Sequence, residues 1–251
     1  MQALGFGLFG VILGSFLNVC IDRIPRGESL AAGRSHCDSC GRPLSALELI
    51  PVLSYIALHG RCRRCGVRIP LRVPLVEFGT GILFGLIWVR YPAGLETLLI
   101  AVYGALLIVI LAIDLERGRI LNKLSYPAIC LALLAVPFTP GRDAEQLLIG
   151  GAAAFGLLLL IAWIYPAGMG MGDVKLAAFI GLTVGHPQVW LALFLAFVGG
   201  GLISGGLVLA RVIGRKDPIA FGPFLAAAAI ATLLYGEQIL NWWSRGICHE
   251  S

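Results

Sequence analysis

The chain has 251 residues, of which 58% are hydrophobic and only 13% are charged. The charged share is about half of what soluble domains carry, so this composition excludes a disordered protein and argues strongly against a soluble globular one. The formal net charge of +5 does not indicate a nucleic-acid partner, because the charges are few and basic membrane proteins are common.

Uncharged apolar runs predict the membrane spans, since about 20 such residues cross a hydrocarbon core roughly 30 Å thick. The first run covers residues 1–21, and positive charge follows it instead of preceding it, unlike in a secretory signal. A second span is expected at about 73–90. Further runs without an ionisable acidic or basic side chain are 97–113, 124–141, 146–172 and 218–236.

The stretch 176–210 contains no Asp, Glu, Lys or Arg and is too long for one crossing, because a single helix would measure roughly 52 Å. Gly185-His186-Pro187 predicts a turn within it. We therefore expect a short span at about 172–185 and a longer one at about 188–212. The total is an all-α polytopic membrane protein with about eight transmembrane helices.

The basic residues predict the orientation of these spans. Of the 19 Lys and Arg residues, 16 fall in loops 22–72, 114–123, 166–175 and 211–220. The positive-inside rule places these loops in the cytoplasm and both termini outside. Segment 22–72 is the only long loop, so the expected organisation is span 1 (1–21), a cytoplasmic module (22–72) and a seven-helix membrane domain (73–245).

The module carries two CxxC pairs, Cys37 with Cys40 and Cys62 with Cys65. Each pair is followed by a glycine, which permits the tight backbone turn that aims two sulfurs at one ion. Two pairs at this separation can supply four thiolates to a tetrahedral zinc ion. Because a four-cysteine site is closed, the predicted zinc is structural and holds together a loop with few core residues.

Two carboxylates are expected at the same membrane face. Asp114 ends one predicted span and Asp173 begins another, both on the cytoplasmic side. Ionisable groups at such a boundary are costly and often functional, although each could instead pair with a nearby base such as Arg117 or Lys175.

Glycines Gly168, Gly170 and Gly172 precede Asp173 and leave room for another backbone beside its carboxylate. Two carboxylates that share a proton can act as general base and general acid on one water, which is aspartic-protease chemistry and needs no metal.

In these features the chain resembles the type IV prepilin leader peptidases, intramembrane aspartic proteases of the GxGD type that are often also N-methyltransferases. The resemblance covers nearly the whole chain. It includes segment 14–19 (Gly-Ser-Phe-Leu-Asn-Val), the two CxxC pairs, segment 74–77 (Pro-Leu-Val-Glu), segment 170–175 (Gly-Met-Gly-Asp-Val-Lys) and segment 221–225 (Phe-Gly-Pro-Phe-Leu). One departure is Asn122, where the family often has an aspartate.

The resemblance implies a bacterial inner-membrane enzyme that uses Asp114 and Asp173 to cut the basic leader from prepilins and pseudopilins at the cytoplasmic face. Methylation of the new N-terminal amine by S-adenosylmethionine is also implied. Glu77 is a candidate for orienting that amine, and its alternative is a carboxylate favoured by the positive end of its helix. The motif residues Gly170, Gly172 and Lys175 are expected to support the substrate site.

Two other classes of function remain open on the sequence. Paired membrane carboxylates also serve ion- or proton-coupled transporters, although those expected here lie at one face with none near the midplane. A zinc-anchored scaffold without catalysis is a third possibility. Replacing either aspartate would distinguish them, because a scaffold would tolerate the change and a peptidase would not.

Overall fold

The computed structural model describes residues 1–248 apart from positions 32, 92, 167, 213 and 215–219. Over these residues it is entirely helical, with nine α-helices, two short 3-10 helices and no β-strand. Part of the basic loop 211–220 and the terminal residue Ser251, which we expect outside the membrane, fall beyond this description.

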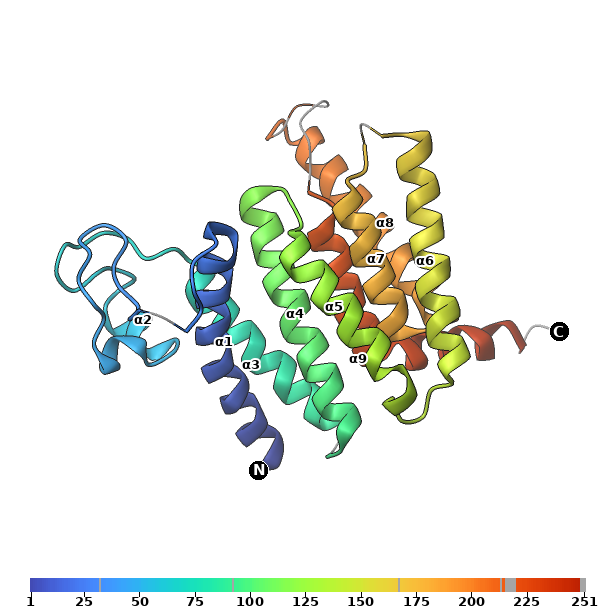
Figure 1. Cartoon of the computed structure of the whole chain (residues 1–251), viewed down its shortest axis with the longest axis horizontal. Helices are drawn as coiled ribbons and strands as arrows, with labels where there is room; N and C mark the ends of the chain where they lie inside the picture. Colours follow the sequence, from blue (N-terminus) through green and yellow to red (C-terminus); the bar gives the residue numbers. More distant parts are fainter. Residues whose placement is uncertain (32, 92, 167, 213, 215–219, 249–251) are drawn as a thin grey trace. The chain divides into compact units, whose positions relative to one another are not determined.

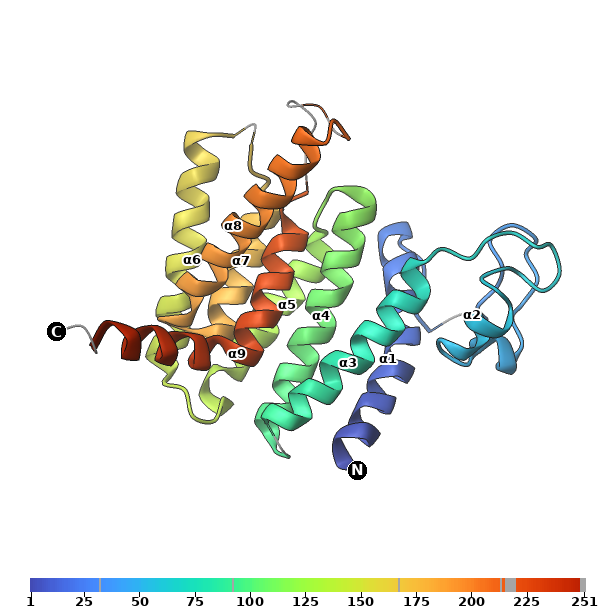
Figure 2. The ribbon, with the colours of Figure 1, turned by 180° about the vertical axis from the view of Figure 1, so that it is seen from behind.

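The helices follow the predicted spans closely (Figures 1 and 2). The long helices are α1 (Gln2–Arg26), α3 (Arg72–Arg90), α4 (Leu95–Arg117), α6 (Ala144–Ile164), α8 (Gln188–Leu209) and α9 (Gly222–Cys248). The shorter elements are η1 (Ala46–Leu49), α2 (Leu53–Ala57), α5 (Asn122–Ala135), η2 (Val136–Phe138) and α7 (Met171–Val184). The predicted turn at Gly185–Pro187 separates α7 from α8.

Six of these helices are long and apolar enough to cross a membrane. Helical structure suits these apolar segments, because it satisfies every backbone N–H and C=O where no water is present. The other two predicted spans are shorter. The helix α5 with η2 forms one apolar segment over Asn122–Phe138, and the 14 residues of α7 rise only about 21 Å. Six helices therefore qualify as membrane spans by length and composition, and the count of eight, which places the Asp114 and Asp173 ends of their helices on one side, stays a prediction.

The chain divides into two units, residues 1–97 and residues 98 onward. In the first, α1 packs along α3, and the cysteine-rich segment 27–71 connects them. The two helices approach closely at Gly14, where an added Cβ would come within 2.7 Å of the Glu77 Cα. This close approach brings polar side chains of both helices together, as described below.

In the second unit, α7 is the central helix and packs against α5, α6, α8 and α9. Every residue from Leu176 to Val184 is buried. The α6 and α7 backbones nearly touch, since a Cβ on Gly181 would lie 2.2 Å from the Gly150 carbonyl oxygen. Gly150 and its neighbour Gly151 therefore allow the two helices to pack closely. In α8, by contrast, an added Cβ would meet no heavy atom within 4 Å at Gly199, Gly201, Gly205 or Gly206. Close packing among the described residues therefore does not require these four glycines.

Candidate functional site: two aspartates at helix ends and a four-cysteine cluster

Asp114 lies in the last turn of α4 and Asp173 in the first turn of α7, as the sequence predicts. The Asp114 side chain is buried, with 3% of its surface exposed. Asp173 is the third residue of its helix, and the backbone N–H groups of Gly170 and of Asp173 itself hydrogen-bond to its carboxylate. A carboxylate that caps a helix N-terminus in this way also interacts favourably with the helix dipole.

The N-terminus of α9 completes the surroundings of Asp114. The Gly222 backbone hydrogen-bonds to the Asp114 carboxylate, and a Cβ at Gly222 would lie 2.5 Å from Oδ2. Asp114 and Asp173 are close enough for their charges to interact. The structure therefore brings together carboxylates that are 59 positions apart in the numbering of the sequence.

Ile120, in the loop between α4 and α5, lies between the starts of α7 and α9. Its Cβ would be 2.9 Å from a Cβ added at Gly172, and its Cδ1 would be 2.9 Å from one added at Gly222. Both glycines are therefore needed for the close approach of this side chain. The sequence indicated the glycine at position 172, but nothing in it singled out Ile120 as the side chain between the two helix ends.

Neither aspartate forms an ion pair with a base in the part of the chain that the structure describes. Lys175 lies two residues after Asp173, but its Nζ donates to Oδ1 of Asn122 at 2.7 Å. The same ammonium sits 4.6 Å from the centre of the Tyr126 ring. The alternative that Lys175 pairs with Asp173 is therefore wrong, and neither carboxylate has a basic partner within the described part of the chain.

Arg142 holds the far end of the aspartate-bearing helix. Its Nη1 donates to the carbonyl oxygens of Thr183 and Val184, at 2.7 and 3.1 Å. These are among the final carbonyls of α7, which have no partner within the helix, and a cation there is favoured by the helix dipole. Nothing in the sequence pattern indicated this contact, because Arg142 is only one of the three Lys and Arg residues outside the four basic loops.

The four cysteines form one cluster in the first unit. Their sulfurs all lie within 4.8 Å of one another, and the Sγ atoms of Cys37 and Cys65 are 3.8 Å apart. A tetrahedral zinc ion with Zn–S bonds near 2.3 Å separates its sulfurs by roughly 3.8 Å, so the cluster matches the size of such a site. The residues can hold a metal ion, as predicted.

The two CxxC turns have the same backbone pattern. The N–H of Cys37 donates to the Arg42 carbonyl, and that of Cys62 donates to the Val67 carbonyl. In each turn the following glycine has positive φ, which relieves the strain that a side chain would meet. Backbone hydrogen bonds from Cys65 and Arg64 lower the pKa of the Cys62 thiol to about 6. Burial and the hydrogen bonds with Cys62 and Cys40 raise the pKa of the Cys37 thiol to about 11, so the first thiolate of the cluster forms at Cys62.

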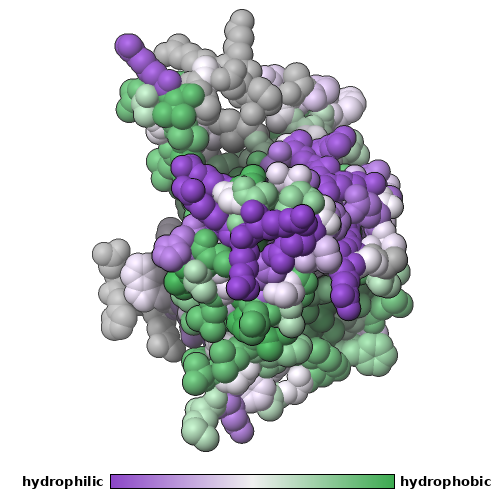
Figure 3. All heavy atoms as spheres, turned by 90° about the vertical axis from the view of Figure 1, so that its left-hand side faces the viewer, coloured by the Kyte–Doolittle hydropathy of each residue, from purple (hydrophilic) through white to green (hydrophobic). Residues whose placement is uncertain are grey.

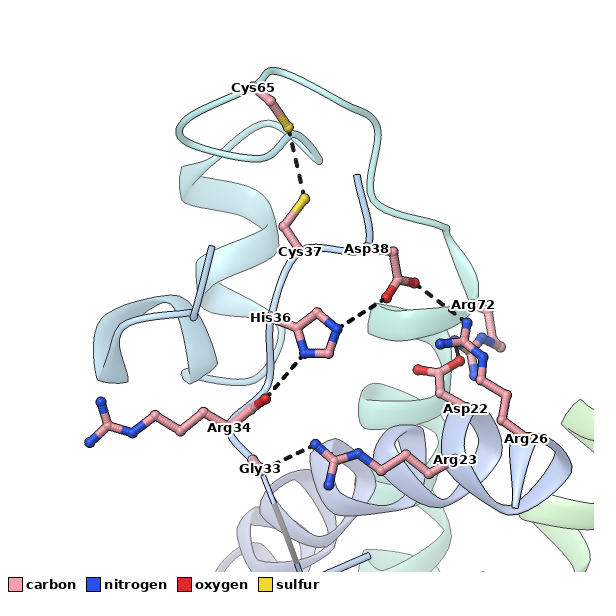
Figure 4. A network of polar contacts seen from close by, with 10 residues as sticks. All are labelled: Asp22, Arg23, Arg26, Gly33, Arg34, His36, Cys37, Asp38, Cys65 and Arg72. Atoms are coloured by element: carbon pink, nitrogen blue, oxygen red, sulfur yellow. Dashed lines mark hydrogen bonds and ion pairs between the residues drawn. The ribbon is translucent and has the colours of Figure 1, made fainter. Parts of the chain in front are cut away.

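Polar contacts tie the first CxxC turn to the end of α1 (Figure 4). Asp38 lies 3.7 Å from Arg26 and 4.0 Å from His36, and Arg23 donates to the Gly33 carbonyl at 3.2 Å. His36 points toward Asp38 and away from the sulfurs in this view. Exposed pairs of this kind stabilise little individually, so their role is to orient the turn beside the membrane helix.

Glu77 lies in a separate group of polar residues in the first unit, whereas Asp114 and Asp173 belong to the second unit. It is 5% exposed, and its Oε2 accepts the N–H of Val52 at 2.7 Å. Ser15 hydrogen-bonds to the same carboxylate. Asn18 donates to the Val73 carbonyl at 3.0 Å, while its buried Oδ1 has no hydrogen-bond partner among the described residues. Glu77 therefore accepts a specific hydrogen bond from the Val52 backbone, in addition to lying near the N-terminus of α3.

Comparison with known proteins covers both units. Residues 8–91 match a family model described as the bacterial peptidase A24 N-terminal domain, and residues 101–205 match the type IV leader peptidase family. The chain is 35% identical over 236 residues to the prepilin leader peptidase/N-methyltransferase of Bacillus subtilis, covering 94% of this chain and 95% of the relative.

Proteins of the same description from two further bacteria are also similar. The one from Aeromonas salmonicida is 32% identical over 269 residues, covering 94% of this chain and 91% of the relative. The one from Burkholderia pseudomallei is 33% identical over 265 residues, covering 91% and 84%. No solved structure matches the chain.

Proposed function

The chain belongs to the type IV leader peptidase family, and from this premise we propose that it is a membrane aspartic endopeptidase that removes the leader of prepilins and pseudopilins. The observation that carries this proposal is the arrangement of Asp114 and Asp173. They come from the ends of two different helices, their charges interact, and neither forms an ion pair with a base among the residues that the structure describes.

In the proposed reaction one aspartate is ionised and accepts a proton from a water molecule, while the other is protonated and donates to the scissile carbonyl oxygen. The helix-capping contacts of Asp173 and the backbone contact of Asp114 orient the two carboxylates. Small residues beside them leave space for an extended substrate backbone. A Cβ at Gly170, for example, would come within 3.3 Å of Oδ2 of Asp173.

The proposed site faces the cytoplasm of a bacterium, and the chain is a multi-pass inner-membrane protein with both termini outside. The support is the distribution of basic residues, 16 of 19 of which lie in the loops on the aspartate side. The substrate chemistry agrees with this orientation, because a basic leader is retained on the cytoplasmic side by the same rule. Cysteine labelling from either side of the membrane tests it, and a cytoplasmic C-terminus would contradict the eight-span topology.

The cysteine cluster is proposed to bind structural zinc. The match between the sulfur spacing and tetrahedral zinc geometry supports this identity, and all four coordination positions are filled by thiolates. Such a closed site supplies folding energy to segment 27–71 and takes no part in peptide hydrolysis. The purified protein is expected to contain about one zinc ion per chain.

The second proposed activity is methylation of the new N-terminal amine. S-adenosylmethionine, when bound, would supply the methyl group. The described residues form no β-strand that could precede a glycine loop, and we propose no site for this cofactor. Glu77 is proposed to orient the amine. Its buried carboxylate and the free Oδ1 of Asn18 are acceptors, which an ammonium group requires.

Purified protein incubated with a prepilin peptide, followed by mass spectrometry of the product N-terminus, tests both activities. We expect cleavage after the leader glycine, and an added methyl group only when S-adenosylmethionine is present. Asp114→Asn and Asp173→Asn should each abolish cleavage while the protein stays folded and retains its zinc. Asp143→Asn is a matched control, because Asp143 is an exposed helix-capping residue at α6 and asparagine caps equally well.

Near-normal cleavage by Asp114→Asn would overturn the assignment of the catalytic pair. The transport alternative makes a different prediction for the same proteins. A transporter would move ions or protons in vesicles and leave the peptide intact, whereas the peptidase releases the leader in detergent without any membrane potential.

A further inference from the structure

The segment between the two CxxC turns exposes apolar side chains that nothing in the described chain covers. Neither η1 nor α2 buries a residue, and Leu47, Leu53 and Ile56 have 71%, 65% and 64% of their surface exposed. Leu53 and Ile56 are three positions apart, so they share one face of α2. Tyr55 points elsewhere, toward Gly60 at the second CxxC turn. An isolated helix of five residues is not stable in water, so this face needs a partner.

The position of this segment along α3 indicates what the partner is. Val52 joins η1 to α2, and its N–H is bonded to Glu77, five residues after the start of α3. Five residues correspond to about 7.5 Å along a helix axis. The segment is therefore held beside the second turn of a membrane-spanning helix and not above it. Interfacial helices lie at a similar depth, about 5–10 Å into the boundary between headgroups and acyl chains.

The charges around the segment complement an anionic lipid surface. Residues 49–76 contain five arginines and no Asp or Glu. Four of these arginines are exposed and surround the second CxxC turn: Arg61, Arg63, Arg64 and Arg68. Figure 3 faces this part of the molecule and shows hydrophilic side chains gathered above a band of apolar ones. Arginines beside a membrane span are attracted to anionic lipids, by about 1 kcal/mol for each residue near the surface.

We propose that residues 46–57 form an interfacial element that inserts Leu47, Leu53 and Ile56 into the lipid leaflet beside the start of α3. The four exposed arginines contact the phosphates of anionic lipids in that leaflet. The element thereby holds the four-cysteine cluster flat against the membrane. This inference concerns lipid binding and does not depend on the proposed peptidase activity.

The test uses the full-length protein in nanodiscs made from phosphatidylcholine alone or with added phosphatidylglycerol, without substrate. Hydrogen exchange of peptides covering residues 46–57 is the readout. We expect slow exchange in both, and slower exchange when phosphatidylglycerol is present. The double variant Leu53→Ser/Ile56→Ser should exchange rapidly in both. Leu30→Ser is the matched control, because Leu30 is an exposed apolar residue of the same loop outside η1 and α2.

The arginines are tested with Arg63→Gln/Arg64→Gln. This variant should reduce the effect of phosphatidylglycerol on exchange by about fivefold for each arginine removed. Zinc content is measured for every variant, which confirms that the cysteine cluster has formed. Exchange that is equally fast in native protein and in Leu53→Ser/Ile56→Ser would overturn the proposal. Protection that appears only after a prepilin peptide is added would also overturn it and would assign the apolar face to the substrate helix.

Discussion

Gly222 lies so close to Asp114 that a Cβ atom at this position would be 2.5 Å from the carboxylate oxygen Oδ2. The backbone of the same glycine hydrogen-bonds to that carboxylate. The first residue of α9 therefore fixes the position of the Asp114 side chain at the end of α4. In the proposed peptidase this contact determines how accurately the carboxylate meets substrate and water.

Gly222→Ala should therefore impair cleavage strongly. The new methyl group must displace either the Asp114 carboxylate or the start of α9, and it would also meet Ile120 Cδ1 at 2.9 Å. A displacement of about 1 Å in a catalytic group can reduce the rate roughly 100-fold. We expect a loss of this size in kcat/KM for prepilin cleavage, measured by the rate of appearance of the mature N-terminus.

Gly205→Ala is the control for this change. Gly205 also lies in a helix of the second unit, but a Cβ there would have no heavy atom within 4 Å. Its cleavage rate should stay close to that of the native protein. Equal activity of the two variants would show that the close contact at Gly222 does not position Asp114 for catalysis.

Asn122→Asp should have little effect on cleavage. Asn122 Oδ1 already accepts a hydrogen bond from Lys175 at 2.7 Å, and an aspartate would accept the same bond with an added charge. Lys175 is held by this contact and by the Tyr126 ring, away from an ion pair with Asp173. We expect kcat/KM to change by less than about threefold, because a partly exposed ion pair contributes little energy. A tenfold loss would indicate that charge at position 122 acts on the aspartates.

The elements that depend on composition and short motifs could be predicted from the sequence. The turn at Gly185–Pro187, the helix ends that carry Asp114 and Asp173, and the four-cysteine cluster could all be predicted, because each depends on local signals. The short span expected at about 172–185 also agrees with α7 (Met171–Val184), because the turn that ends it is a local signal.

The contacts that depend on tertiary packing could not be predicted from the sequence. Nothing near Arg142 in the sequence indicates that its guanidinium reaches carbonyls 41 and 42 positions later. The hydrogen bond between Val52 and Glu77 could not be predicted either. It requires Val52 to adopt φ 61°, a backbone conformation that a β-branched residue rarely takes and that nothing in the sequence signals. Such positions become visible only when the partner that stabilises them is known.

Cys40→Ser should remove the metal from the cluster. A site that depends on four thiolates loses most of its affinity when one becomes a hydroxyl, so elemental analysis should find well under one zinc per chain. We expect segment 27–71 to become more accessible to proteases and methylation to fall more than cleavage, because the aspartates belong to the other unit. Cys130→Ser is the control, since Cys130 is an exposed cysteine of α5 outside the cluster.

The last prediction concerns Arg142, which holds the C-terminal end of α7, the helix that carries Asp173 at its N-terminal end. The helix has Asp173 in its first turn, and the Arg142 guanidinium donates hydrogen bonds to carbonyls at its other end. A negative charge at the N-terminus and a positive charge at the C-terminus both interact favourably with the helix dipole. Arg142→Gln removes the cation and should destabilise the protein by about 2 kcal/mol, the usual value for hydrogen bonds to a charged group. Arg142→Lys keeps the charge but lacks the planar group that bonds to two carbonyls, so it should be intermediate. Thermal unfolding in detergent and hydrogen exchange of residues 181–186 measure these effects, with the exposed Arg119→Gln as the control. If exchange at 181–186 is the same in Arg142→Gln and native protein, Arg142 does not anchor the helix that carries Asp173.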